Sequence, residues 1–208
     1  LLLIVVYFLY LKAHPTFSRD MNKHITFLTL GLLLYIGFTE LAVYIAHSSN
    51  PEMSGKMASN AIYMVVPLPA AAMLTCIFLG FDIALYFSLV LCSLCTISFG
   101  CEFQVFLFFF LSSVTAAYWI KERNERHHFI VAGFKLAVFN ACLAIALGFF
   151  MPSQVPWGIL LKQVTMAVGG GVFAAILTVG FTPLIEVLFN YTTAAKLLEF
   201  SNLDQPLI

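Results

Sequence analysis

Residues Phe129 to Phe150 read FIVAGFKLAVFNACLAIALGFF, in which Lys135 is the one charged side chain. A second apolar stretch, ILLKQVTMAVGGGVFAAILTVGFTPLIEVLFN, follows from Ile159 to Asn190. A helix needs about 20 mostly apolar residues to cross the roughly 30 Å of hydrocarbon in a bilayer. We therefore predict two membrane-spanning helices here. The second is longer than one crossing needs, so we expect it to leave the membrane or to break near Pro183.

The rest of the chain has the same character. Of its 208 residues, 62% are hydrophobic and 10% are charged, and the mean hydropathy is +0.98. Soluble domains carry about 25% charged residues. Five further spans are predicted, at Leu1 to Lys12, His24 to His47, Ala61 to Leu79, Asp82 to Phe99 and Phe103 to Ile120. The sequence thus predicts an all-α integral membrane protein with seven transmembrane helices.

The positive charges predict the orientation. Short loops rich in Lys and Arg stay in the cytoplasm. If the amino end lies outside, seven cations fall on the cytoplasmic side, namely Lys12, Arg19, Lys23, Lys121, Arg123, Arg126 and Lys196, against Lys56 and Lys162 outside. We therefore expect an outer amino end and a cytoplasmic carboxyl end.

The ends of the chain predict its domain organisation. The sequence begins without Met, inside the apolar run from Leu1 to Val6, so we expect it to be a piece of a longer protein. Residues 1–190 form the predicted seven-helix domain, and residues 191–208 form a predicted cytoplasmic linker.

Glu40 is an ionisable residue inside a predicted span, where a charge is costly unless it is paired, protonated or facing a cavity. Tyr44 and His47 lie four and seven residues later, on the same helical face. This pattern indicates a ligand or proton site. A protonated glutamate bonded to a neighbouring helix explains it equally well, so both interpretations stay open.

Two prolines, Pro67 and Pro69, interrupt the predicted span from Ala61 to Leu79. Each removes a backbone donor, which predicts a kink or an irregular turn. Irregular backbone at membrane depth often borders a cavity. We therefore add both prolines to the candidate polar site of Glu40, Tyr44 and His47.

Small residues gather in the last span. They are Gly169, Gly170, Gly171, Ala174 and Ala175. Small residues four apart let helix backbones approach closely in a membrane. Helix packing is the expected role, and a flexible hinge is the alternative.

The chain lacks the sequence motifs of several classes of enzyme. The chain contains neither Gly-x-Ser-x-Gly nor His-Glu-x-x-His, and the middle of its last span, Phe173 to Ala175, has no lysine for retinal. It also contains no polybasic tract for nucleic acid. We expect no catalytic residue, metal site or cofactor in this segment.

The carboxyl end resembles the junction between the membrane and catalytic domains of the bacterial seven-transmembrane receptor HD-hydrolase family. The residues that match that family's pattern are Pro183, Leu184, Glu186, Phe189, Thr192, Thr193, Leu197, Leu198, Glu199, Ser201, Asn202, Pro206 and Leu207. All except Leu184 and Leu207 are candidate residues of a coupling linker. The chain departs from the pattern at Phe200, where Leu is usual, and at Leu203 to Gln205, where Pro-Asn-His is common.

The resemblance implies a full-length protein with a large extracytoplasmic domain, these helices and a cytoplasmic HD domain. It further implies hydrolysis of cyclic di-AMP at a two-metal site in the HD domain, outside this chain. The membrane segment would then receive a signal and pass it on. The partners expected for it are the bilayer, a small-molecule or lipid ligand, its own flanking domains and a second copy of the chain.

A transporter or channel-like protein is the alternative function. In that case Glu40 and the break at Pro67 and Pro69 would line a substrate path. Transporter folds often contain an internal repeat, and the two halves of this chain show no convincing one.

Overall fold

The computed structural model describes residues 21–49, 61–121, 126–149, 156–189 and 191. Within these residues the chain is all helical. The elements are α2 (Met21–Ser49), a 3-10 turn η2 (Tyr63–Val65), α4 (Leu68–Leu79), α5 (Phe81–Ser98), α6 (Phe103–Ile120), α7 (Arg126–Phe149) and α8 (Trp157–Phe189). Of the described helices, α2, α5, α6, α7 and α8 are long and apolar enough to cross a membrane, and Tyr63–Leu79 forms a shorter apolar segment.

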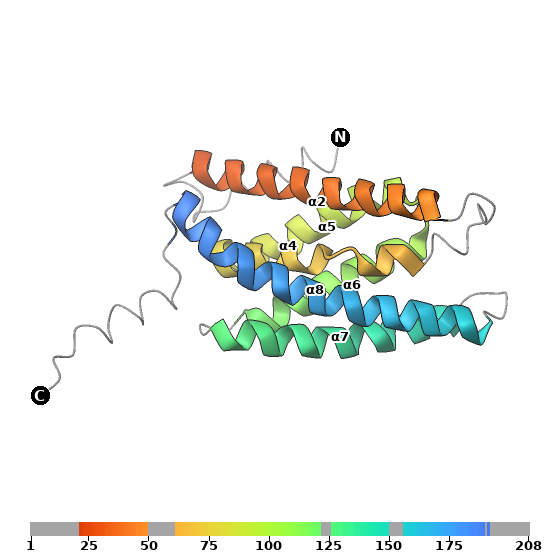
Figure 1. Ribbon diagram of the computed structural model, residues 1–208. Coiled ribbons are helices and arrows are strands. Elements are labelled where there is room, and N and C mark those ends of the chain that lie inside the picture. Colours follow the sequence, from red (N-terminus) through yellow and green to blue (C-terminus); the bar gives the residue numbers. More distant parts are fainter. Residues whose placement is uncertain (1–20, 50–60, 122–125, 150–155, 190, 192–208) are drawn as a thin grey trace, which may run out of the picture.

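The helices form a bundle with α4 at its centre (Figure 1). α4 packs against α2, α5, α6 and α8, and α7 packs along α8 at the edge away from α2. All residues from Leu68 to Cys76 are buried. A helix that is apolar on every side is expected in such a position. The long helices around it bury one side and expose leucine, valine and phenylalanine on the other, as lipid-facing helices do.

The predicted spans agree with the described helices to within a few residues, and one of them is divided. The predicted span from Ala61 to Leu79 is interrupted at Val66, whose φ of −63° and ψ of 120° are extended. The ring of Pro67 disfavours helical geometry at the residue before it. α4 therefore begins only at Leu68, after the break that its prolines predict. The first predicted span, Leu1 to Lys12, lies outside the described residues.

α8 continues through Pro183 to Phe189, so of the two alternatives, leaving the membrane or breaking near Pro183, the break does not occur. Its predicted length beyond one crossing is confirmed.

The link between α4 and α5 is a single residue, Gly80. Its φ of 95° lies in the left-handed region that L side chains rarely adopt, which explains a glycine at this sharp reversal.

Candidate functional site

Glu40 joins two helices. The hydroxyl of Ser98 at the end of α5 donates a hydrogen bond to Oε1 of Glu40 on α2, at 2.6 Å. Glu40 is exposed on the bundle surface, and Tyr44, one turn later, is 72% exposed. The side chain of His47 lies outside the described residues. This is the contact of a glutamate that is hydrogen-bonded to a neighbouring helix.

Pro67 and Pro69 are buried at the centre of the bundle, whereas Glu40 lies on its surface. The break that they create meets the glycines of α8. A Cβ added to Gly170 would lie 2.1 Å from the carbonyl oxygen of Met64 in η2. Two features that the sequence predicts separately, the proline break and the glycine run, thus pack against each other.

Gly171 and Ala175 of α8 face α7. A Cβ added to Gly171 would lie 2.6 Å from the Cα of Ala137, and one added to Gly133 would lie 2.1 Å from the Cβ of Ala175. Gly170, Gly171, Ala174 and Ala175 are all buried. Gly169 is exposed, and no atom lies within 4 Å of the Cβ that it would gain. Gly170, Gly171 and Ala175 therefore occupy sites of close helix approach, whereas Gly169 does not.

Buried polar groups that sequence patterns do not single out occur between the helices. Ser112 of α6 donates a hydrogen bond to Oδ1 of Asn140 of α7 at 2.6 Å, and both side chains are buried. Oε1 of Gln163 and the hydroxyl of Tyr35 are also buried, and neither has a hydrogen-bond partner among the described residues. The sequence does not identify these side chains as buried polar groups, because a single amide or hydroxyl is common in apolar spans.

An aromatic cluster joins the carboxyl end of α8 to the start of α2 and to the end of α4. We call it the Tyr191 cluster; its members are Lys23, His24, Phe27, Phe78, Phe189 and Tyr191. The Tyr191 ring stacks on Phe78 with centroids 5.3 Å apart and on His24 at 5.6 Å. Its hydroxyl hydrogen-bonds to Nδ1 of His24, and Nζ of Lys23 lies 4.2 Å from its centroid.

Phe27 completes this cluster. Its ring meets Phe78 edge-on at 5.8 Å and Phe189 at 5.6 Å. Aromatic pairs in such arrangements add about 0.5–1.5 kcal/mol each beyond the area they bury. The cluster therefore holds Tyr191 against α2 and α4.

Three candidate coupling residues lie in or near this region. Phe189 belongs to the cluster, Glu186 is buried one turn earlier, and Pro183 is exposed. The remaining candidates, Thr192, Thr193, Leu197, Leu198, Glu199, Ser201, Asn202 and Pro206, lie outside the described residues.

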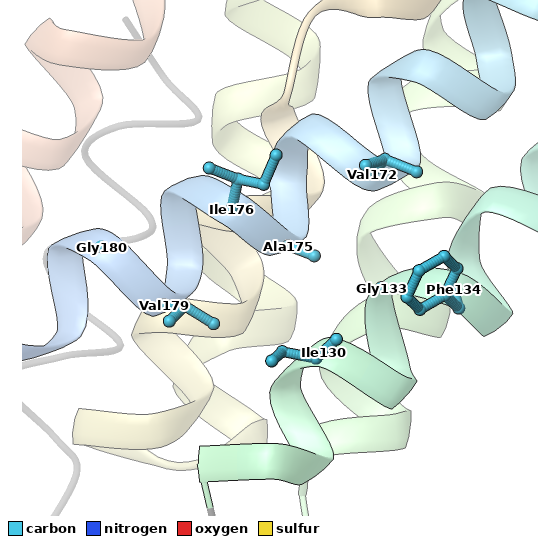
Figure 2. Close-up of a pocket in the computed structure, with 8 residues that line it drawn as sticks. All are labelled: Ile130, Gly133, Phe134, Val172, Ala175, Ile176, Val179 and Gly180. Carbon is cyan, nitrogen blue, oxygen red and sulfur yellow. The ribbon is translucent and has the colours of Figure 1, made fainter.

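Two apolar pockets lie against α8. One, of about 400 Å³, is formed by α7 and α8, with Ile130 and Val179 between the two helices in Figure 2. The other, of about 210 Å³, lies among α2, α4, α5 and α8. No group of three His, Cys, Asp or Glu residues within the described ranges is arranged to hold a metal ion.

Comparison with known proteins identifies the family. Residues 1–193 match the family described as a 7TM receptor with intracellular HD hydrolase. The chain belongs to this family. The resemblance drawn from the carboxyl end is thereby confirmed, and this membrane domain family accounts for the apolar helices of the bundle.

Two curated relatives carry the same name, cyclic-di-AMP phosphodiesterase PgpH. The protein from Bacillus subtilis (strain 168) is 21% identical over 212 residues, which cover 99% of this chain and 30% of that protein. The protein from Listeria monocytogenes (serotype 1/2a, strain 10403S) is 28% identical over 102 residues, which cover 49% of this chain and 14% of that protein. The chain thus spans less than a third of the length of these family members. No solved structure matches it.

Proposed function

We propose that this chain is the sensory and anchoring membrane domain of an HD-type cyclic dinucleotide phosphodiesterase, with cyclic di-AMP as the substrate of the full-length protein. The observation that carries the proposal is the family match over residues 1–193. The name of the two relatives supports the substrate. The two-metal site and the hydrolysis belong to the HD domain, and the membrane domain contributes the regulation.

The proposed topology has seven spans in the bacterial cytoplasmic membrane. The five candidate spans and the apolar segment Tyr63–Leu79 supply six of them, and the apolar run from Leu1 to Lys12 supplies the seventh. Lys23 and Lys121 lie at the end of the bundle where α8 finishes, since Lys23 contacts Tyr191 and Lys121 contacts Phe81 at the start of α5. The excess of positive charge supports a cytoplasmic location for this end.

The proposed relay runs through α8. This helix of 33 residues is about 50 Å long. It contacts η2 and α7 along its middle and carries the Tyr191 cluster at its end, where the linker of residues 191–208 begins. A signal that favours one placement of α8 would move the linker, to the extent that its affinity differs between the two placements.

The test is carried out on the full-length protein in lipid nanodiscs. Tyr191→Ala removes the ring on which His24 and Phe78 stack, and we expect it to change the rate of cyclic di-AMP hydrolysis severalfold. A few glycines inserted after Thr193 should abolish this effect while basal hydrolysis continues. Tyr191→Phe, which keeps the stacking, is the matched control and should change the rate less.

The relay is wrong if Tyr191→Ala leaves hydrolysis unchanged in a folded protein, or if it has the same effect with and without the glycines. A full-length protein that hydrolyses no cyclic di-AMP would overturn the proposed substrate.

A further inference from the structure

The pocket of about 210 Å³ lies between α2 and α8, next to the Tyr191 cluster. Its inner wall is formed by buried side chains of α2, α4 and α5, namely Phe27, Leu28, Ala71, Leu74 and Phe87. Its outer rim is formed by leucines that face away from the bundle. Leu30 of α2 is 52% exposed, and Leu184 and Leu188 of α8 are 54% and 75% exposed. The pocket therefore opens from the centre of the bundle onto its lipid-facing surface.

The lining selects an apolar occupant. Thr75 supplies its one hydroxyl, and that hydroxyl already donates a hydrogen bond to the carbonyl oxygen of Ala71 at 2.8 Å. A polar ligand would find no unbonded side-chain group in the lining. Apolar cavities of about 150 Å³ in proteins exclude water and bind small hydrocarbons. Because the solvent at the rim of this pocket is hydrocarbon, a chain of the bilayer can enter without leaving water.

A cation lies beyond the lining of this pocket, on the far side of Tyr191. Phe27 and Phe189 line it and also pack against Tyr191, over whose ring lies the ammonium group of Lys23. A lipid whose acyl chain fills the pocket would thus hold its headgroup phosphate near Lys23. This charge complementarity favours a phospholipid over an uncharged apolar metabolite, and it favours the leaflet on the Lys23 side.

We infer that the pocket between α2 and α8 binds the acyl chain of a phospholipid, and that the bound chain sets the position of α8 at the Tyr191 cluster. The regulatory part of this inference rests on the proposed function. Phe27 and Phe189, whose rings are 5.6 Å apart, face each other from α2 and α8. A chain beside this contact fills the remaining space between α2 and α8, whereas an empty pocket leaves that space open and lets α8 shift.

The pocket between α7 and α8 serves as a comparison. It is lined by Gly180, Ile176 and other apolar residues, and none of its lining residues belongs to the Tyr191 cluster. Lipid in that pocket should therefore have no effect on the proposed relay.

The experiment uses the full-length protein in nanodiscs that contain phosphatidylglycerol with a photoreactive group in its acyl chain. We expect labelling of α2 and α8 at the pocket lining. Gly31→Leu and Ala71→Leu each fill the pocket, and both should lower this labelling about tenfold, equivalent to about 1.4 kcal/mol of binding free energy. A Cβ on Gly31 would lie 3.7 Å from Phe87, an ordinary contact, so this residue accepts a side chain.

Gly180→Leu is the matched control, because no atom lies within 4 Å of the added Cβ. It should lower labelling only between α7 and α8. Labelling at α2 and α8 that persists in both filling variants would overturn the inference. So would cross-linking at the pocket to residues 1–20 or to a second copy of the chain.

Hydrolysis measured on the same samples separates the two proposals. A changed rate in the filling variants, and not in Gly180→Leu, supports the regulatory part. Loss of labelling with an unchanged rate keeps the lipid site and overturns its role in the relay. Absence of cyclic di-AMP hydrolysis in the unsubstituted protein overturns the proposed function and leaves the labelling result standing.

Discussion

Gly170 of α8 lies so close to Met64 that a single added carbon would collide with the carbonyl oxygen, at 2.1 Å. Neither partner can move cheaply, because one is the helix backbone and the other is the backbone of the turn before α4. The contact places the glycine run of the last helix directly against the irregular segment at the centre of the bundle.

Gly170→Ala should therefore destabilise the bundle. Overpacking in a dense core costs about 1–3 kcal/mol, and here the obstacle is backbone. Gly169→Ala is the matched control, since its added Cβ meets no atom within 4 Å and alanine favours a helix over glycine by about 1 kcal/mol. Thermal unfolding in detergent should show a lower midpoint for Gly170→Ala and an equal or higher one for Gly169→Ala. Equal midpoints for the two variants would contradict the close approach.

The buried hydrogen bond between Ser112 and Asn140 should contribute measurably to stability. Hydrogen bonds between membrane helices contribute about 0.6 kcal/mol on average and up to about 1.7. A double-mutant cycle with Ser112→Ala and Asn140→Leu should give a coupling free energy in this range. Thr115→Ala offers a control on the same helix, because its hydroxyl bonds only within α6, to the carbonyl of Leu111. Additive effects of Ser112→Ala and Asn140→Leu would show that the pair is not coupled.

Glu40→Gln should leave the fold intact. Glutamine keeps an oxygen that can accept the hydrogen bond from Ser98, so the unfolding midpoint should stay near that of the unsubstituted chain. Glu40→Ala removes the acceptor and should lower it. If Glu40 also forms a ligand or proton site, Glu40→Gln should blunt the response of the full-length protein to its signal, and an unchanged response would exclude that role.

The native cysteines test the orientation. Cys101 is exposed in the turn between α5 and α6, which the proposed topology places outside the cell, and Cys142 is exposed in the second half of α7. A membrane-impermeant maleimide added to whole cells should label Cys101 and spare Cys142, which faces lipid. Cys101→Ser should abolish the labelling. Labelling of Cys101 only after the cells are broken would reverse the topology.

The sequence predicts well where the helices lie along the chain, but it predicts poorly which helices contact one another. α6 spans Phe103–Ile120 as predicted, because length and apolar composition suffice to define a transmembrane helix. The break before α4 is also predicted from the local sequence, because Pro67 disfavours helical geometry at Val66. These features depend on residues that are neighbours in the chain.

The Tyr191 cluster could not be predicted on such grounds. Tyr191 and His24 are 167 positions apart, and nothing in either local sequence indicates the other. Gly170 and Met64, which also contact each other, are likewise far apart in the sequence. The glycine run predicts that some backbone approaches α8, but the identity of that backbone depends on how every helix packs.

The close contacts near the middle of α8 give the helix a fulcrum. Gly170 against Met64 and Gly171 against Ala137 leave little room for translation there. About 28 Å of continuous helix separates this point from Phe189. Rocking by about 5° around it would displace the far end by about 2.5 Å. α8 thus has the geometry of a lever, in which a small rotation about the close contacts gives a larger displacement at Phe189.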